Sequence, residues 1–338
     1  RAKRAGVIIL KRVAITGMGV VSPVGKKIGE FWQNLTAGVC GVGPIARFDA
    51  SGFKVRIAAE VKDFRPEEHG IERGDARRMD LFTQFALAAA NEAMDMSGIL
   101  GTVEPERLGV YVGSGIGGMH TFVTENEKLL TRGPSRVSPL YIPMMIANIA
   151  AGNIAIKYAA KGPSLPVVTA CATSTHAIGE AFRAIKHGYA DAVIAGGSEA
   201  TIEPLAVAGF TNCKALTEAE DPQAASLPFD QRRAGFVMGE GAGIVVLEEW
   251  ERAVARGARV YAEVTGYGNT CDAYHITAPD PAAEGGARAI SLALEEAGGL
   301  RGSLYINAHG TGTPLNDTSE TLAIKKALGE EAARAARI

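Results

Sequence analysis

The chain has 338 residues, with 35 Lys and Arg against 37 Asp and Glu, which leaves a formal net charge of −2. Hydrophobic residues make up 47% of the chain, so it is too apolar to be disordered and long enough for one large or two ordinary domains. Because the charge is nearly balanced, there is no electrostatic reason to expect a nucleic-acid partner or an anionic membrane surface.

Predicted strands rich in Val and Ile alternate with longer amphipathic stretches along the chain. The strand-like runs cover residues 13–16, 108–112, 166–169, 192–195, 243–247, 259–265 and 304–306. The helical patterns cover residues 79–96, 139–160, 176–187, 284–297 and 318–328. Strands that lack strict alternation and are separated by helices are typical of sheets buried on both faces, so the sequence predicts an α/β protein.

Cysteine usage and apolar runs favour a cytoplasmic protein. The four cysteines are far apart and form no Cys-x-x-Cys pair, which argues against a disulfide scaffold or any metal site. The basic N-terminus has a four-residue apolar run, shorter than the ~7–15 residues of a signal peptide. The uncharged stretch 137–156 has the length of a membrane span, but Pro139 and Pro143 favour a buried segment that ends in a core helix.

Two segments of the chain resemble each other weakly. Residues 165–169 lead into Ala-Cys-Ala-Thr-Ser-Thr and then a helix, and residues 304–307 lead into Ala-His-Gly-Thr-Gly-Thr and then a helix. Cys171 and His309 occupy the same position in the two copies. A duplicated fold whose halves face each other would therefore bring a thiol close to an imidazole, although chance similarity over six positions remains an alternative.

Cys171 is the candidate nucleophile. It lies among small residues where a predicted strand passes into a helix, and the positive end of a helix dipole favours the reactive thiolate. The alternative for any cysteine is a small buried hydrophobe, which is the interpretation that we give to Cys40, Cys213 and Cys271.

His309 is the second candidate, because it lies in a corner that is rich in glycine and lined with hydroxyls. The hydroxyls of Thr311 and Thr313 alternate and could face one side to bind an amide-bearing substrate; the alternative is that they cap the helix that starts at Pro314. We interpret His176 as structural. The glycine-rich segment 113–118 lacks the spacing of a nucleotide-binding loop and is predicted to be a close-packed corner.

Several motifs in sequence resemble the β-ketoacyl-[acyl-carrier-protein] synthases, with synthase II of bacterial fatty acid synthesis the closest in likeness. The motifs are ITGMGVVSPVG at 15–25, RFDAS at 47–51, GSGIGG at 113–118, SPLYIPMMIAN at 138–148, VVTACATS at 167–174, GFVMGEGAG at 235–243, DAYHIT at 272–277 and NAHGTGTPLND at 307–317. The likeness runs from about residue 11 to the last residue.

The resemblance implies a thiolase-like fold, in which two pseudo-symmetric halves form a five-layered α-β-α-β-α stack. The halves would be residues 11–250, which carry the nucleophile, and residues 251–338, an incomplete second half with the first catalytic histidine. It also implies a homodimer in the cytoplasm.

The resemblance further implies a role for individual residues. Cys171 would accept the acyl group, and His309 would assist decarboxylation and stabilise the enolate oxygen. Thr311, Thr313 and Thr277 would bind the phosphopantetheine arm. The acyl chain would be bound by Ile116, Tyr141 and Met145. Glu320 would support the site.

The implied reaction extends acyl thioesters by decarboxylative Claisen condensation with malonyl-[acyl-carrier protein]. The partner would be acyl carrier protein, whose 4'-phosphopantetheine carries the substrates, and no separate cofactor would be needed. Preorganised N–H groups, with that of Cys171 first among them, would stabilise the thioester oxygen.

The sequence departs from the family pattern in ways that predict a truncated and impaired synthase. No histidine follows His309, so the family's second catalytic histidine is missing. The lysine of the segment that follows in the family and the C-terminal glycine-rich loop are missing too. Smaller departures are Lys214, Leu227 and Ala234, where Arg, Arg and Asp are more usual.

Three other classes of protein were weighed. A thiolase has the same fold but uses a second cysteine as base, and Cys213 and Cys271 lie in unlike contexts. A non-catalytic chain-length factor usually lacks the nucleophile, so Cys171 argues against it. A papain-like protease has a similar Cys-to-His separation, but its cysteine motif is absent here.

Overall fold

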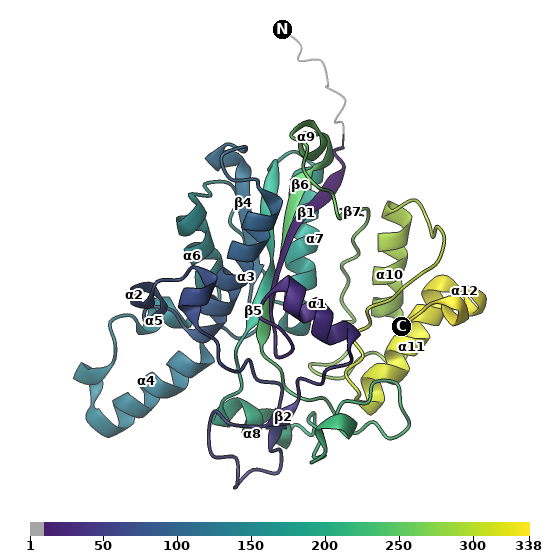
Figure 1. The fold of residues 1–338 in the computed structure, drawn as a ribbon. Helices are drawn as coiled ribbons and strands as arrows, with labels where there is room; N and C mark the ends of the chain where they lie inside the picture. The colour runs from purple at the N-terminus through teal and green to yellow at the C-terminus, as the bar shows by residue number, and fades with distance from the viewer. Residues whose placement is uncertain (1–9) are drawn as a thin grey trace. The chain divides into compact units, whose positions relative to one another are not determined.

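A computed structural model of the protein describes residues 10–338 (Figure 1). The apolar run discussed for the N-terminus lies largely outside the described residues. The chain forms two compact units, each assembled from segments that are distant in sequence. Unit 1 contains the residues up to Val39, Val61–Thr201 and Glu240–Val264, and unit 2 contains Cys40–Glu60, Ile202–Gly239 and Thr265–Ile338.

Unit 1 is built on a five-stranded mixed sheet. Its strands, in spatial order, are β4 (Leu108–Gly113), β5 (Ala192–Glu199), β6 (Gly241–Glu249), β1 (Val13–Val21) and β7 (Ala262–Val264). Only β4 and β5 pair in parallel, with Leu108 opposite Ala192. The other pairs are antiparallel. The expected mixed α/β character is therefore present.

Helices cover both faces of this sheet. Helix α3 (Leu81–Ser97) packs along β1 and β6, and α7 (Thr173–Lys186) packs along β5 and β4. In β5, Ala192 and Ile194 belong to the core cluster that contains α3, while the alternate residues of the strand are equally buried. The prediction of strands buried on both faces is confirmed, because a strand between two helical layers has no polar side.

The contact between β1 and α3 depends on the absence of a side chain. A Cβ added at Gly19 would lie 1.9 Å from the carbonyl oxygen of Ala89 on α3. The helix backbone therefore rests directly on the strand, which explains the short glycine-containing motif at this point of the sequence.

The remaining helices of unit 1 surround this centre. They are α1 (Ile28–Thr36), α2 (Arg73–Ala76), α4 (Met119–Arg132), α5 (Tyr141–Met145), α6 (Ile149–Tyr158) and α9 (Trp250–Ala255). The single helix predicted for 139–160 is wrong: it is broken between α5 and α6, where the carbonyl of Met145 accepts from the amide of Gly118 at 2.9 Å. Its second part does enter the core, with Ala150 and Ile154 buried.

Unit 2 is mainly helical over the described residues. Its elements are β2 (Gly43–Pro44), β3 (Ile57–Ala58), α8 (Pro204–Asn212), α10 (Glu284–Glu296), α11 (Pro314–Leu328) and α12 (Glu330–Ala335). Helices α10 and α11 pack on each other through small side chains, where Ala283 and Ala287 meet Ala323. Within residues 10–338, no helix has the length and apolar character required to cross a membrane.

The predictions of strands at residues 166–169 and 304–306 are wrong. Residues 166–169 form no ladder: Ser164 makes one bridge to Val110, and the following Pro166 has no N–H to continue it. Residues 304–306 make a single bridge, from Tyr305 to Arg337, instead of a strand. The two copies of the weak repeat therefore share a turn followed by a helix but no strand before it.

Candidate active site

Cys171 lies in a tight turn directly before α7. The turn is a short 3-10 helix, Ala170–Ala172. Ala170 has a φ of +51°, which lies in the left-handed region. The hydroxyl of Thr173 accepts from the amide of Thr169 at 2.9 Å, and the carbonyl of Thr169 accepts from the amide of Ala172 at 3.1 Å. These bonds fix the backbone so that Cys171 is exposed at the positive end of a 14-residue helix.

The turn sits at the carboxyl end of the two parallel strands. A Cβ added at Gly197 of β5 would lie 2.4 Å from Oγ of Ser174, in the first turn of α7. The start of α7 therefore lies against the end of β5. Sheets with parallel strands commonly bind ligands at this end, so the position suits a reactive residue.

Ile116 and Met145 lie on two segments that are hydrogen-bonded to each other. The segment 113–118 leaves the end of β4, and Ile116 on it is 42% exposed. The amide of Gly118 donates to the carbonyl of Met145 at the end of α5, and Tyr141 begins the same short helix. The three predicted acyl-chain residues thus lie on two segments held by a direct hydrogen bond.

His309 lies on a loop of unit 2 that is held by Glu320 of α11. One carboxylate oxygen accepts from the amide of His309 at 2.7 Å, and the other accepts from the amide of Gly310 at 2.8 Å. A charged acceptor on two successive amides fixes the loop, while the role of Glu320 in catalysis stays a prediction. His309 itself is exposed.

The hydroxyls of Thr311 and Thr313 lie 2.9 Å apart and are hydrogen-bonded to each other. Thr313 also caps α11 by accepting from the amide of Asn316, so the capping alternative holds for this residue as well. Thr277 belongs to another loop, where its amide and that of Ala278 donate to Nδ1 of His275.

Asp317 supports the same loop and was missed from the sequence. It is 2% exposed, and its carboxylate accepts from the amide of Phe229 at 2.6 Å and from that of Gly312 at 3.2 Å. It therefore ties the segment around Phe229 to the histidine loop. An acidic residue at the start of a helix, directly after the Gly-Thr motif, is the signal that could have indicated this role.

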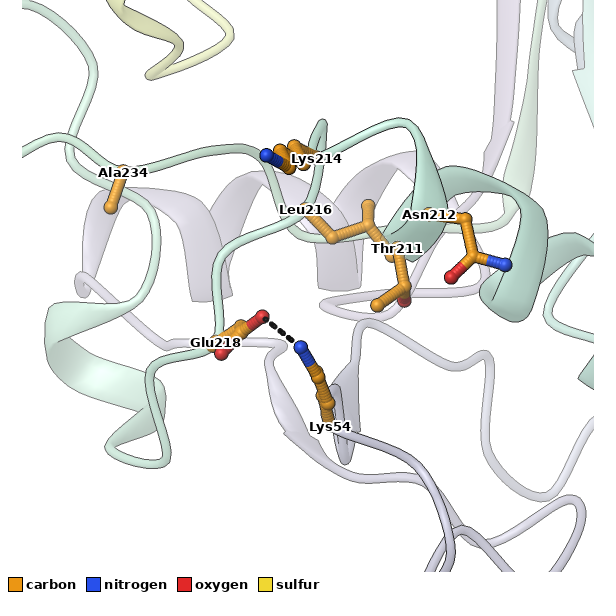
Figure 2. Close-up of a pocket in the computed structure, with 7 residues that line it drawn as sticks. All are labelled: Lys54, Thr211, Asn212, Lys214, Leu216, Glu218 and Ala234. Carbon is orange, nitrogen blue, oxygen red and sulfur yellow. Dashed lines mark ion pairs between the residues drawn. The ribbon is translucent and has the colours of Figure 1, made fainter.

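A separate pocket of about 470 Å³ lies in unit 2 (Figure 2). Its lining residues are Lys54, Thr211, Asn212, Lys214, Leu216, Glu218 and Ala234. Nζ of Lys54 lies 3.9 Å from a carboxylate oxygen of Glu218 across it. The lining contains two of the departures from the family pattern, Lys214 and Ala234, and none of the predicted site residues.

Comparison with known proteins settles the family. The model of the β-ketoacyl synthase N-terminal domain matches residues 10–253, and that of the C-terminal domain matches residues 261–338. The chain belongs to the β-ketoacyl synthase family. It is 51% identical over 326 residues to 3-oxoacyl-[acyl-carrier-protein] synthase 2 of Synechocystis sp., with 95% of this chain and 78% of that protein covered.

Solved structures of ketosynthases have the same fold. The structure described as the ishigamide ketosynthase/chain length factor superposes with a TM-score of 0.87 at 37% identity, over 95% of this chain and 78% of that one. The ketosynthase of a type II polyketide acyl-carrier-protein complex, AntDE:AntF, superposes with a TM-score of 0.84 at 34% identity, over 96% and 79%.

These comparisons confirm the predicted family and the thiolase-like α/β fold of this β-ketoacyl synthase. They also decide against a thiolase and a papain-like protease. The roles of the individual residues, the division of the chain near residue 250, and the approach of Cys171 to His309 stay predictions.

Proposed function

We propose that this β-ketoacyl synthase is a 3-oxoacyl-[acyl-carrier-protein] synthase, a condensing acyltransferase of fatty acid synthesis. It extends an acyl thioester by decarboxylative condensation with malonyl-[acyl-carrier protein]. Family membership and the likeness to the Synechocystis enzyme support the reaction class. The observation that carries the assignment to residues is the exposed thiol of Cys171 at the start of α7.

In the first half-reaction, the Cys171 thiolate attacks the carbonyl carbon of the acyl thioester. The carbon–sulfur bond to the phosphopantetheine arm then breaks, the carrier's sulfur leaves as a thiolate that takes a proton from water, and the acyl group stays on Cys171. The N-terminus of α7 stabilises the thiolate, and the backbone N–H of Cys171 stabilises the negative charge that develops on the thioester oxygen.

In the second half-reaction, malonyl thioester loses carbon dioxide, and the resulting carbanion attacks the acyl group on Cys171. The bond between that carbonyl carbon and sulfur breaks, which releases the 3-oxoacyl thioester and restores the thiolate. His309 stabilises the enolate oxygen that forms when carbon dioxide leaves. Glu320 holds the loop of His309, while Thr311, Thr313 and Thr277 bind the phosphopantetheine arm.

The proposal includes acyl carrier protein as the partner and a homodimer as the working form. The ketosynthase of the AntDE:AntF complex was solved together with its acyl-carrier protein, which supports the first of these. The substrates arrive on 4'-phosphopantetheine, so the condensation itself calls for no further cofactor. We also propose that the protein is cytoplasmic, as the sequence predicts.

Acyl transfer to the purified chain tests the nucleophile. After incubation with acyl-[acyl-carrier protein], we expect intact-protein mass spectrometry to show one added acyl group, and peptide mapping to place it on Cys171. Cys171→Ala should abolish the mass shift. Cys213→Ala is the matched control and should keep it, because Cys213 is also exposed and not buried as predicted from the sequence.

Release of carbon dioxide from malonyl-[acyl-carrier protein], followed separately, tests His309. We expect His309→Ala to lower the rate by about 10²–10³-fold, as loss of one oxyanion-stabilising donor does, while acylation of Cys171 continues. Labelling that persists in Cys171→Ala would overturn the nucleophile assignment, and unchanged decarboxylation in His309→Ala would overturn that of His309.

A further inference from the structure

A carboxylate that the mechanism does not use lies at the end of β5. Glu199 is its last residue, and its side chain crosses to the segment that leaves β4, 84 residues earlier in the chain. One oxygen accepts from the hydroxyl of Ser114 at 3.0 Å, and the other accepts from the amide of Gly115 at 2.9 Å. The amide of Ile116 donates to the same carboxylate.

Ser114 extends this contact to the rest of the segment. It is 1% exposed, and its Oγ accepts from the amide of Gly117 at 2.9 Å while its proton goes to Glu199. Three successive amides, those of residues 115 to 117, are thus bound directly or through one hydroxyl to a single carboxylate. We call residues 113–118, the segment that carries Ile116, the Ile116 loop.

The Ile116 loop lies between the two other parts of the candidate site in unit 1. A Cβ added at Gly115 would be 2.9 Å from the Glu199 carboxylate and 3.5 Å from the carbonyl oxygen of Ala170, the residue before Cys171. At its other end, the loop donates from Gly118 to Met145. A change in the loop would therefore reach both the nucleophile turn and the acyl-chain residues.

We propose that Glu199 is a positioning residue that clamps the Ile116 loop and thereby sets which acyl chains the enzyme accepts. The effect on acyl-chain choice rests on the proposed function and on the place beside the acyl chain that the family resemblance implies for Ile116. The clamp itself is a property of the fold and is testable without substrate.

The environment of Glu199 explains why a carboxylate is suited to the task. Burial raises its pKa, and the hydrogen bonds from Ser114, Gly115, Ile116 and Ala200 act to lower it. These donors all point at one group, and only a carboxylate offers acceptors alone. In Glu199→Gln, an NH₂ group replaces one of the two oxygens, and this group donates a hydrogen bond instead of accepting one. It would face either a backbone amide, which is also a donor, or the Ser114 hydroxyl, whose proton would have to turn away.

Hydrogen–deuterium exchange tests the clamp on the full chain. In Glu199→Gln and in Ser114→Ala, we expect the amides of the Ile116 loop to exchange roughly tenfold faster, which corresponds to the loss of one hydrogen bond to a charged group. Those of β4 and β5 should stay protected. Ser114→Ala removes only a buried hydroxyl, so it keeps the test valid if Glu199→Gln folds poorly.

Glu92→Gln is the matched control. Its carboxylate also accepts from two backbone amides, those of Val20 at 3.1 Å and Ile28 at 2.8 Å, on a connection that contains no proposed site residue. This variant should leave exchange in the Ile116 loop unchanged. Unchanged exchange in both clamp variants, or an equal increase in Glu92→Gln, would overturn the clamp.

The second readout is the preference for acyl-chain length, measured as the ratio of Cys171 acylation rates with long and short acyl donors. We expect this ratio to change at least threefold in Glu199→Gln and Ser114→Ala, and to stay constant in Glu92→Gln. A uniform loss for all donors, or an unchanged ratio, would reject the role in selectivity. If the unmodified chain is not acylated at all, the proposed function fails, and the exchange experiment still decides the clamp.

Discussion

At the scale of single residues, carboxylates that accept backbone amides organise both parts of the candidate site. Glu320 and Asp317 hold the histidine loop in unit 2, and Glu199 holds the Ile116 loop in unit 1. Each accepts from more than one backbone N–H group, and bonds to a charged acceptor are stronger than neutral ones. None of the three is itself placed in contact with the reacting atoms.

The raised pKa of Glu199 predicts a pH-dependent stability. A carboxyl group whose pKa is higher in the folded than in the unfolded chain favours folding when it is protonated. Its contribution to stability is fully present below the unfolded pKa of about 4.3. That contribution is lost as the pH rises through the folded pKa. The stability of the wild-type chain relative to Glu199→Gln should therefore fall as the pH rises from about 4.

Urea unfolding of both proteins across this pH range measures the effect, because all other titrating groups cancel in the difference. A difference in the free energy of unfolding that stays constant or grows with pH would contradict the direction of the shift.

At the scale of elements, the docking of α7 on β5 and of α3 on β1 depends on strand glycines that leave room for the helix. Helix α7 rests on β5 at Gly197, and α3 rests on β1 at Gly19. Helix α3 takes its position from a strand that is far away in sequence, whereas α7 and β5 follow each other along the chain. The geometry of Cys171 thus follows from how α7 docks on the sheet as much as from the residues around it.

Gly19→Ala tests the docking of α3. Its new Cβ would lie 1.9 Å from a helix carbonyl, so the helix must move, and we expect the free energy of unfolding to fall by about 3 kcal/mol. Gly243→Ala on β6 is the control, because its Cβ would meet nothing within 4 Å, and the change should stay within about 0.5 kcal/mol. Equal effects of the two variants in urea unfolding would reject the close-packing explanation.

At the scale of the whole molecule, the exposed segment beside β4 bears on assembly. Leu165 and Val168 are 46% and 54% exposed and lie just after the bridge to Val110 at the edge of the unit 1 sheet. Apolar side chains beside a sheet edge are typical of a surface that another chain covers. This segment is therefore our candidate for the interface of the proposed homodimer.

Val168→Glu tests that interface. We expect the wild-type chain to sediment as a dimer and Val168→Glu to weaken dimerisation at least about tenfold, because a charge would be buried without a partner. Leu35→Glu, at a residue of α1 that is 50% exposed, should leave the dimer intact. A monomeric wild-type chain, or a dimer unaffected by Val168→Glu, would contradict the prediction.

Local sequence determined the long helices and the family motifs. Helices predicted at 79–96 and 284–297 are observed at Leu81–Ser97 and Glu284–Glu296, because their periodic apolar residues specify a helix without reference to distant segments. The turn at Cys171 before a helix was also predicted, since small residues and hydroxyls favour a helix start. The motifs around it were sufficient to name the family.

The tertiary structure decided what depends on pairing across the chain. The strand predicted at 166–169 is absent. A strand needs a partner on another segment, and the sequence of residues 166–169 alone does not show whether that partner pairs with it. The break after Met145 forms where the Gly118 amide binds its carbonyl, and the clamp on the Ile116 loop joins residues 84 positions apart. Hydrogen bonds between distant segments form only when the chain has folded, so local sequence patterns do not predict them.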